Sequence, residues 1–263
     1  MSGHRARKRF GQHFLHDPTV LERIVQAVDP RPGDRLLEIG PGTGALTARL
    51  LAHGLPLDVI EIDRDLAAAL RERWGTRLTL HEGDALEFDY AALAQQRGGP
   101  LRLIGNLPYN ISTPLLFRLL AFLPAVQDMH IMLQKEVIDR MAAAPGSDDY
   151  GRLTVMLAPW LQVEKLFDVG PGAFKPPPRV WSAVARVDVL PQPRFTVPPA
   201  YGAVVAAAFS ARRKTLRNAL RALLPESAYA TCGIDPGLRP EVLAPAQFAA
   251  LAALAAAPGA VVS

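Results

Sequence analysis

The sequence is poor in cysteine and in long apolar runs. Cys232 is the only cysteine among 263 residues, which excludes an intrachain disulfide and a cysteine-rich metal cluster and suits a reducing compartment. No uninterrupted apolar run is long enough to span a bilayer, and the basic N-terminus continues into Phe10-Gly11-Gln12 instead of an apolar signal core. We therefore expect a soluble cytoplasmic protein with no metal centre and no membrane partner.

The composition is that of an ordinary folded protein, with 49% hydrophobic and 21% charged residues. The length predicts one sizeable core with a smaller appended unit, and a single compact globule is the alternative. Lys and Arg exceed Asp and Glu by 29 to 25, giving a net charge of +4. An excess of this sign makes an anionic polymer a reasonable partner.

The first half of the chain alternates short apolar runs with segments of helical periodicity. Asp17-Pro18 is typical of an N-cap followed by a first-turn proline, and it begins a helix through about Val28. Thr113-Pro114 gives a second such start. The apolar runs are 35–39, 57–62, 77–80, 101–104 and 130–133, and the helical segments are 45–52, 65–73, 113–123 and 135–144. This alternation predicts a parallel sheet with crossover helices on its faces.

The pattern changes after Gly151. A helix from Arg152 is followed by two strand-like runs, 162–169 and 180–189, which a proline-rich segment joins and which we expect to pair antiparallel on one side of the sheet. Four prolines between residues 191 and 199 mark a linker, and alanine-rich and leucine-rich helix formers continue to Ala257. We predict an α/β domain over residues 1–190 with a mostly parallel seven-stranded sheet, and an all-helical domain over residues 191–263.

A glycine-rich turn follows the first predicted strand, in Glu38-Ile39-Gly40-Pro41-Gly42-Thr43-Gly44. Glycines permit a tight turn and let the backbone approach a ligand closely. Glu61 ends the next strand, where a carboxylate can accept hydrogen bonds from ribose hydroxyls, and Asp84 follows the third strand, where it can contact an adenine. The turn alone also fits a dinucleotide-binding enzyme or a purely structural turn, and strand-end acids taken singly are often only solvated.

A polar loop, Asn106-Leu107-Pro108-Tyr109, follows the fourth predicted strand and reaches the same edge of the sheet. The exocyclic amine of adenine is a poor nucleophile, so its methylation requires the nitrogen to be held and rehybridised. The Asn106 side-chain oxygen and the Pro108 carbonyl can each accept one amine hydrogen, and Tyr109 can stack on an extruded base. A strand-to-helix turn in which Asn and Pro serve only backbone geometry is the alternative. No metal or general base is required.

Several segments together resemble the ribosomal RNA adenine dimethyltransferases, in particular those that act on the bacterial small subunit. They are Arg9-Phe10-Gly11-Gln12-His13-Phe14-Leu15, Glu38 to Gly42, Gly105 to Ser112, Leu133-Gln134-Lys135-Glu136 and Arg212 to Asn218. The resemblance covers nearly the whole chain and implies a Rossmann-like class I methyltransferase fold. It further implies that S-adenosylmethionine donates methyl groups to two adjacent adenosines near the 3′ end of 16S rRNA, two to each, late in small-subunit assembly.

The resemblance also implies roles for individual residues. The implied cofactor contacts are His13, Leu15, Gly40, Glu61, Asp84 and Asn106. Many family members have Asn where this chain has His13, so that contact is made either by a ring nitrogen or by the backbone. The implied adenine site consists of Asn106, Leu107, Pro108, Tyr109 and Phe174, with Phe174 on the other face of the flipped base. A buried phenylalanine that anchors a proline loop is the alternative for Phe174.

A basic surface is expected in the C-terminal domain. Arg213, Arg217 and Arg221 recur every four residues, which on one helix makes a stripe opposite Leu216, Leu220 and Leu223. Together with Lys214 these arginines are the expected rRNA-binding residues, and the arm Arg5 to Arg9 can supplement them. The alternative is a merely solvated helix face.

Two other functions compete with a monomeric RNA methyltransferase. A NAD-dependent oxidoreductase would use the same glycine turn, but no proton-relay histidine or Tyr-Lys pair accompanies it, and Asn106 to Tyr109 would have no role. A non-catalytic RNA-binding assembly factor would not need intact Gly40, Glu61, Asp84 and Asn106. Within the enzyme class, a large-subunit rRNA or a DNA adenine methyltransferase is the nearest alternative.

Overall fold

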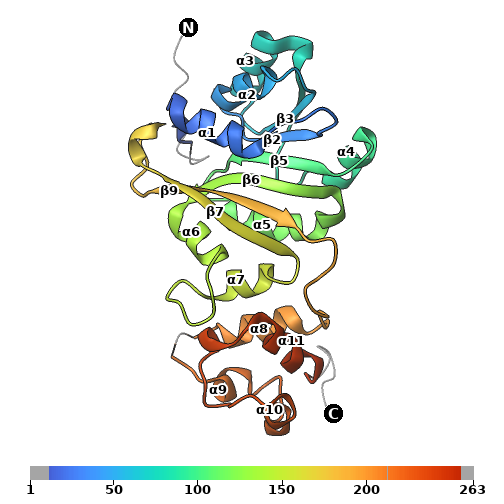
Figure 1. Cartoon of the computed structure of the whole chain (residues 1–263), viewed down its shortest axis with the longest axis vertical. Helices are drawn as coiled ribbons and strands as arrows, with labels where there is room; N and C mark the ends of the chain where they lie inside the picture. Colours follow the sequence, from blue (N-terminus) through green and yellow to red (C-terminus); the bar gives the residue numbers. More distant parts are fainter. Residues whose placement is uncertain (1–11, 212, 256–263) are drawn as a thin grey trace. The chain divides into compact units, whose positions relative to one another are not determined.

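The computed structural model describes residues 12–211 and 213–255, which form two compact units (Figure 1). Within these residues the first unit comprises 12–138 and 163–189, and the second comprises the remainder. The sequence placed one boundary, after residue 190, and in the structure the chain passes from the first unit to the second after residue 189. It also assigned residues 139–162 to the first domain, whereas the structure groups them with the C-terminal helices. The predicted arm Arg5 to Arg9 and Arg212 lie outside the described residues.

A seven-stranded sheet forms the centre of the first unit and confirms the predicted mostly parallel arrangement. Its order is β4-β3-β2-β5-β6-β9-β7, in which β2 to β6 run parallel and β9 is antiparallel to β6. The strands are β2 (Leu36–Ile39), β3 (Leu57–Glu61), β4 (Thr79–Glu82), β5 (Leu101–Asn106), β6 (Val126–Gln134), β7 (Leu161–Val169) and β9 (Ser182–Val189). As predicted, the last two in sequence are neighbours at one edge of the sheet.

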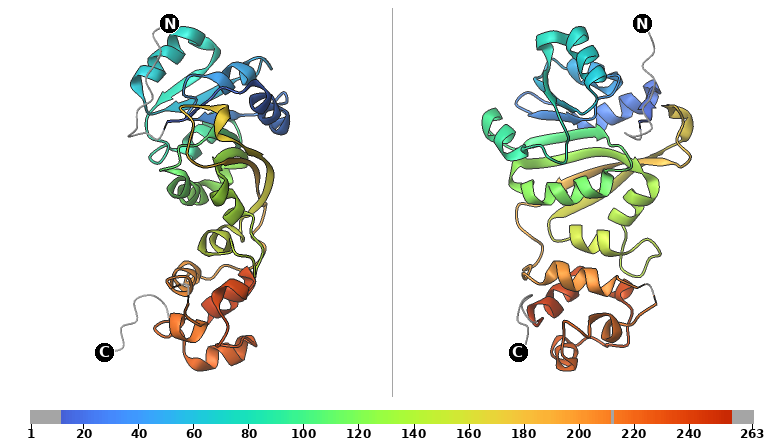
Figure 2. Two further views of the ribbon diagram at one scale, coloured as in Figure 1. Left: turned by 90° about the vertical axis from the view of Figure 1, so that its left-hand side faces the viewer. Right: turned by 180° about the vertical axis from the view of Figure 1, so that it is seen from behind.

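Helices cover both faces of this sheet, which explains why β2 and β3 are buried at every position. Helices α1 and α2 contact each other on one face, and α4 and α5 both contact η3 on the other (Figure 2). The helices are α1 (Pro18–Val28), α2 (Ala45–Leu51), α3 (Arg64–Trp74), α4 (Tyr90–Arg97), α5 (Ser112–Leu119) and α6 (Lys135–Met141), with 3-10 turns η2 (Gly75–Arg77), η3 (Leu120–Ala125) and η4 (Pro171–Ala173).

The predicted helix starts are correct in one case and shifted in the other. Asp17 caps α1 by accepting hydrogen bonds from the N–H groups of Thr19 and Val20. In contrast, α5 begins at Ser112, one residue before the predicted cap, and it ends at Leu119 instead of Leu123. Pro124 and the non-helical dihedrals of Phe122 turn the last predicted part into η3.

A short sheet that the sequence did not predict joins two distant segments. Strand β1 (Phe14–Leu15) pairs antiparallel with β8 (Phe174–Lys175), so that Leu15 lies opposite Phe174. The two strands are only two residues long each, too short for a periodic pattern. This pairing fixes the N-terminal segment against the proline loop that follows β7.

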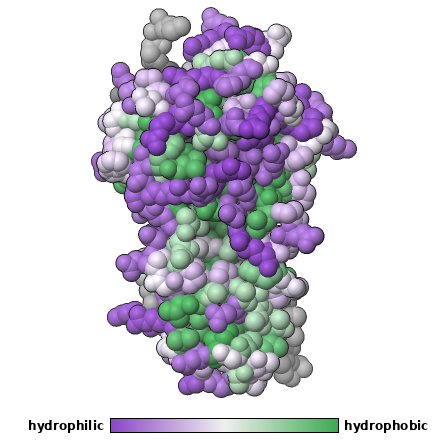
Figure 3. Space-filling view, viewed as in Figure 1, coloured by the Kyte–Doolittle hydropathy of each residue, from purple (hydrophilic) through white to green (hydrophobic). Residues whose placement is uncertain are grey.

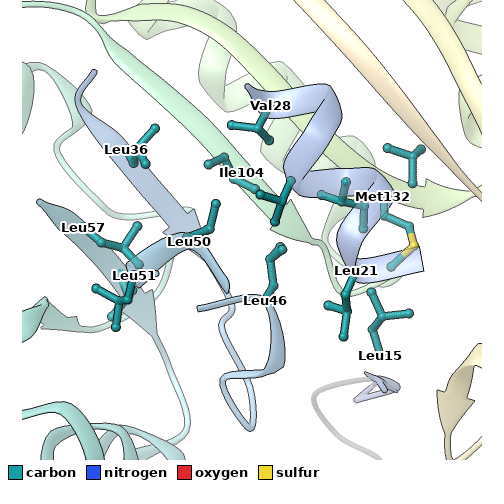
Figure 4. Packing of buried hydrophobic residues seen from close by; sticks show 14 of the residues in the cluster. Leu15, Leu21, Val28, Leu36, Leu46, Leu50, Leu51, Leu57, Ile104 and Met132 are labelled. Atoms are coloured by element: carbon teal, nitrogen blue, oxygen red, sulfur yellow. The ribbon is translucent and has the colours of Figure 1, made fainter. Parts of the chain in front are cut away.

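Leucines from α1 and α2 and from the first strands form the main core of the first unit (Figure 4). Leu21 and Val28 of α1, Leu50 of α2 and Leu36 of β2 are each 1% exposed. Leu46, Ile104 and Met132 project into the same space in Figure 4. The core therefore packs α1 and α2 onto β2, β5 and β6, and fixes the strand ends from which the site is built.

The second unit has its own apolar core and, from residue 190 on, no strand among its described residues. Tyr150 and Tyr201 connect residues 139–162 with the residues from 190 on. The Tyr150 hydroxyl donates to the Leu243 carbonyl at 2.7 Å, and the Tyr201 hydroxyl donates to the Val155 carbonyl at 2.8 Å. These buried contacts explain why residues 139–162 group with it. Its helices are α7 (Arg152–Leu157), α8 (Tyr201–Ala208), α9 (Leu216–Leu220), α10 (Glu226–Cys232) and α11 (Pro245–Ala253), with η5 (Pro240–Val242).

The predicted continuous arginine stripe is wrong. Helix α9 begins at Leu216, so Arg213 precedes it and Arg221 lies at its C-cap. The N–H groups of Leu216 and Arg217 donate to the carbonyls of Leu238 and Pro236, and the chain therefore cannot continue a helix backwards from this point. Leu216 and Leu220 are buried as expected.

Hydrophilic side chains predominate on the face of the first unit seen in Figure 3, whereas apolar ones gather on the second. Leu238, Val242 and Leu254 are among the exposed apolar residues of the second unit. None of the helices in the described part of the chain is long and apolar enough to cross a membrane.

Candidate active site

A pocket of about 250 Å³ opens where the parallel strands end. Residues 12–15, 38–43, 60–62, 83–85 and 106–111 line it, and all of them belong to the first unit. Four of these segments follow or end β2, β3, β4 and β5, and the remaining one contains β1. The carboxyl ends of parallel strands are the usual ligand site of such a sheet, so the predicted glycine turn and polar loop meet in one place.

The glycine turn requires glycine for two separable reasons. Gly40, Gly42 and Gly44 have φ angles of 67°, 58° and 78°, which disfavour any side chain. In addition, a Cβ at Gly44 would lie 2.1 Å from the Trp74 ring, and one at Gly42 would lie 3.0 Å from the Phe14 ring. The turn is therefore closely packed on its outer side, while its pocket side stays open at Gly40.

Glu61 is buried and held in one orientation at the end of β3. One carboxylate oxygen accepts the Gly42 N–H at 3.1 Å, and the other accepts the Asp63 N–H at 2.9 Å. Burial raises the pKa of Glu61, and these backbone donors partly oppose the shift. The next residue, Ile62, is 45% exposed and lines the same pocket. A carboxylate beside exposed apolar surface suits a nucleoside, with its ribose hydroxyls and its flat base.

Asp84 reaches the pocket from the loop after β4 and is half-buried. One of its carboxylate oxygens accepts the Leu86 N–H at 2.9 Å, which fixes the side chain and leaves the other oxygen for a ligand. Glu61, Asp84 and the glycine turn thus line one continuous pocket, as the order of the strand ends predicted.

Glu38 is a second buried carboxyl group in this pocket, on the strand that leads into the glycine turn. It is 2% exposed, and the Thr47 hydroxyl donates to it at 2.7 Å. The pKa of Glu38 is raised to about 7, with burial as the largest cause. The hydrogen bond from Thr47 opposes this shift, and the charge of Glu61 adds to it.

The raised pKa of Glu38 gives a stability prediction. The folded state binds this proton more tightly than the unfolded chain, so the contribution of Glu38 to stability is full below about pH 4.5 and is lost as the pH rises through about 7. Glu38→Gln removes the titration but keeps an acceptor for Thr47. We expect the stability advantage of the variant over wild type, measured by urea unfolding, to grow between these two pH values and then level off. A difference that stays constant with pH would contradict this.

Asn106 ends β5 and is oriented by a distant backbone group. Its Nδ2 donates to the His13 carbonyl at 2.9 Å and the residue lines the pocket, so Oδ1 is the side-chain atom that remains to accept a hydrogen bond from a ligand. Leu107, which the resemblance placed in the adenine site, lines the pocket but is 1% exposed, and its N–H donates to the Met132 carbonyl at 3.1 Å. Leu107 therefore anchors the loop to β6.

The Pro108 carbonyl, the second predicted acceptor, already accepts two hydrogen bonds. The Ile111 N–H donates to it at 3.1 Å and the Ser112 hydroxyl at 3.0 Å. The hydroxyl can rotate away whereas the backbone N–H cannot. An amine hydrogen that reaches this carbonyl would therefore replace the Ser112 bond.

Tyr109 and His13 place two rings beside each other in the pocket. Their centroids are 5.6 Å apart and the planes are inclined by 30°. The Tyr109 hydroxyl is 2.6 Å from the Ser182 Oγ, and burial raises its pKa, an effect that the Ser182 bond opposes. His13 Nδ1 lies 2.8 Å from the Pro176 carbonyl, so Nδ1 carries the proton and the ring is bound to the proline loop.

Phe174 is not among the residues that line this pocket, and the position expected for it opposite a flipped base stays a prediction. It is 2% exposed and belongs to the main core of the first unit. The reason is the pairing with β1, in which Phe174 lies opposite buried Leu15 and turns inward while Lys175 turns outward. The alternative, a buried phenylalanine that anchors the proline loop, describes this structure.

Phe14 and Ile62 are among the pocket residues that were not anticipated from the sequence. Phe14 contacts the glycine turn at Gly42, and Ile62 offers its exposed apolar side chain directly after Glu61. The exposure of Ile62 could have been predicted from the sequence, because an apolar residue directly after the last position of a strand has no core to enter. The position of Phe14 could not have been predicted in this way, since only the β1–β8 pairing brings it to the pocket. No group of three or more His, Cys, Asp or Glu side chains within residues 12–211 and 213–255 is arranged to hold a metal.

Solved structures show which class of protein combines this fold with this site. The chain is similar to a dimethyladenosine transferase from Plasmodium falciparum, with a TM-score of 0.77 and 26% identity over 92% of this chain and 99% of that one. It is also similar to the 23S rRNA methyltransferase ErmE, with a TM-score of 0.70 and 27% identity over 91% and 98% of the two chains. The fold is that of the class I S-adenosylmethionine-dependent methyltransferases.

Sequence comparisons then give the family. Residues 3–256 match the model of the ribosomal RNA adenine dimethylases, and the chain belongs to that family. It is 54% identical to a ribosomal RNA small subunit methyltransferase A from Pseudomonas aeruginosa, over 97% of each chain. It is 55% identical to the enzyme of the same name from Aromatoleum aromaticum, over 95% of this chain and 94% of the other. The protein is an rRNA adenine dimethyltransferase whose methyl donor is S-adenosylmethionine, and the oxidoreductase alternative is excluded.

Proposed function

We propose that this enzyme dimethylates the exocyclic 6-amino groups of two adjacent adenosines near the 3′ end of 16S rRNA during small-subunit biogenesis. The observation that carries the proposal is the position of Asn106, which lines the pocket and whose Nδ2 is bound to the His13 carbonyl, so that Oδ1 remains as its acceptor. The small subunit is supported by relatives of that name at 54% and 55% identity. We further propose that the reaction takes place in the cytoplasm and that the enzyme acts as a monomer.

The proposed cofactor contacts are those that line the pocket around the glycine turn. Glu61 accepts hydrogen bonds from the ribose hydroxyls, and Asp84 accepts one from the adenine amine. Gly40 lets the backbone approach the cofactor closely. Leu15 and the backbone of His13 close the pocket from β1, and Asn106 borders it from β5. The open glycine turn, the fixed carboxylate and exposed Ile62 fit the shape and polarity of this cofactor. When bound, it supplies an activated methyl group on a sulfonium.

The chain itself holds and polarises the adenine amine. Asn106 Oδ1 accepts one amine hydrogen, and the Pro108 carbonyl accepts the second when the Ser112 hydroxyl turns away. With both hydrogens held, the nitrogen lone pair points out of the ring plane, and the two oxygens stabilise the positive charge that develops during transfer. Tyr109 stacks on the extruded base. The proton departs to water after the transfer, so the site needs no general base.

The proposed rRNA-docking surface is in the second unit. Arg213, Lys214, Arg217 and Arg221 are exposed there, although they do not share one helix. Arg217 is paired with Glu226. Exposed cations of this kind contact phosphates without reading the base sequence.

The decisive experiment is methyl transfer to undermethylated small subunits with purified enzyme, followed by RNA digestion and mass spectrometry. We expect dimethyladenosine at two neighbouring positions near the 3′ end of 16S rRNA. Preferential methylation of 23S rRNA or of DNA over 16S rRNA would refute the proposal, as would the absence of any methyl transfer.

The proposed role of Glu61 predicts weaker cofactor binding in Glu61→Ala. Loss of a hydrogen bond to a charged group costs about 1.5–3 kcal/mol, or roughly tenfold to 150-fold in affinity. Because burial raises the pKa of Glu61, wild-type affinity should also fall as the pH is lowered through that raised value, since the protonated acid accepts poorly. Calorimetry with S-adenosylhomocysteine checks both. Glu87→Ala, at an exposed acid outside the pocket, is the control.

A further inference from the structure

Trp181 is an exposed aromatic side chain that the catalytic site leaves without a role. It is 56% exposed, more than any other large apolar side chain in the described part of the chain. It does not contribute to either apolar core. Exposed aromatic rings of this size are costly to leave in water, and they are enriched where a protein meets a partner.

The segment that carries Trp181 is bound to the catalytic pocket at both ends. At one end the Pro176 carbonyl binds the His13 ring, and at the other Ser182 binds the Tyr109 hydroxyl. His13 and Tyr109 both line the pocket. Residues 177–181 therefore lie beside the proposed adenine site, and Trp181 is one residue away from the group that holds Tyr109.

Backbone contacts fix Trp181 without covering its ring. Its carbonyl accepts the Lys135 N–H at 2.9 Å, directly before β9 begins. On one side the ring lies over Gly170, where an added Cβ would sit 3.6 Å from it. A ring held in this way has little freedom left for a stacking partner to remove.

The charge around Trp181 favours a nucleic acid over a protein or an apolar surface. Lys175 and Arg179 are exposed in the same loop. No Asp or Glu occurs between Asp168 and Asp188. A positive segment with an exposed aromatic ring is the arrangement by which proteins bind single-stranded RNA, where cations follow the backbone and bases stack on the ring.

We propose that the loop from Lys175 to Trp181 binds the RNA strand next to the target adenosine, with Trp181 as the stacking platform for a flanking nucleotide. This inference rests on the proposed function, which supplies the RNA. The loop keeps the strand single-stranded beside the pocket. Through Ser182 and Tyr109, it also joins the flanking nucleotide to the ring that holds the adenine.

The test compares Trp181→Leu with Trp181→Phe in the full-length protein. Leu keeps apolar volume beside Gly170 but has no π face, whereas Phe keeps one. The probe is a short fluorescein-labelled single-stranded RNA that contains two adjacent adenosines, and its binding is measured by anisotropy. We expect Trp181→Leu to bind it at least about fivefold more weakly and Trp181→Phe to stay within about twofold of wild type. Val242→Ala, which removes exposed apolar surface in the second unit, should bind like wild type.

Two further measurements separate this role from a structural one. Calorimetric affinity for S-adenosylhomocysteine should be unchanged in Trp181→Leu, and Arg179→Gln should lower the salt dependence of RNA binding by about one phosphate contact. Equal RNA affinity of wild type and Trp181→Leu overturns the inference, as does a parallel loss of cofactor affinity. Trp181-dependent RNA binding by an enzyme that does not methylate 16S rRNA would support this inference and refute the proposed function.

Discussion

Replacing Asn106 by alanine should reduce methyl transfer by at least about 10²-fold while RNA binding stays nearly intact. Removal of one positioned hydrogen-bonding group from a site that stabilises developing charge has an effect of this order. In this enzyme the side chain has two bonding tasks, since Nδ2 binds the His13 carbonyl and, in the proposed mechanism, Oδ1 accepts a hydrogen bond from the amine. The measurement is the rate of radiolabelled methyl transfer to undermethylated small subunits, with filter binding of the same RNA as the second readout.

Asn106→Asp removes the Nδ2 donor that binds the His13 carbonyl and keeps an acceptor oxygen, so it tests the first of these two tasks alone. The aspartate keeps an oxygen toward the pocket but places a second acceptor against the His13 carbonyl, and we therefore expect it to lose activity as well. Gln96→Ala removes an exposed amide on α4 and should leave the rate unchanged. Transfer by Asn106→Ala within a few-fold of wild type would refute the role given to this residue.

Replacing Arg102 by methionine should destabilise the first unit by about 3–5 kcal/mol. Arg102 is 8% exposed and donates to Asp128 at 2.9 Å, to Asp34 at 2.6 Å and to the Val28 carbonyl at 2.7 Å. Burial disfavours the Asp128 carboxylate, but His130 and Arg102 more than compensate and hold its pKa below the ordinary value. Without Arg102 the buried Asp128 carboxylate keeps only His130 beside it, and removal of one partner from a buried ion pair has a cost of this size.

The measurement is urea unfolding at neutral pH. Arg31→Met is the matched control, because it breaks an ion pair with Asp29 in which both side chains are exposed, and such pairs contribute about 0–1 kcal/mol. Because Asp128 has a lowered pKa, the stability that this pair contributes is present at neutral pH and is lost as the pH falls through the acid range. The difference between Arg102→Met and wild type should therefore shrink toward low pH. A loss below 1 kcal/mol at neutral pH would show that the network is not needed for stability.

The sequence by itself determined the features that depend on neighbouring residues. The Asp17-Pro18 start of α1 follows from local capping, and the glycine turn follows from dihedral angles that only glycine adopts easily. The alternation of strands and helices gave the parallel sheet. The order of its strand ends then brought Glu61, Asp84 and Asn106 to one edge, because strands that run parallel end on the same side.

The tertiary structure decided what depends on residues far apart in the chain. The pairing of Leu15 with Phe174 buried a residue expected at the base and brought Phe14 to the glycine turn. The hydrogen bonds of Leu216 and Arg217 to Leu238 and Pro236, respectively, shortened α9 and broke the expected arginine stripe. Tyr150 and Tyr201 joined residues 139–162 to the C-terminal helices. In each case the local pattern was compatible with two arrangements, and the burial of an apolar ring or a hydrogen bond to a distant segment selected one of them.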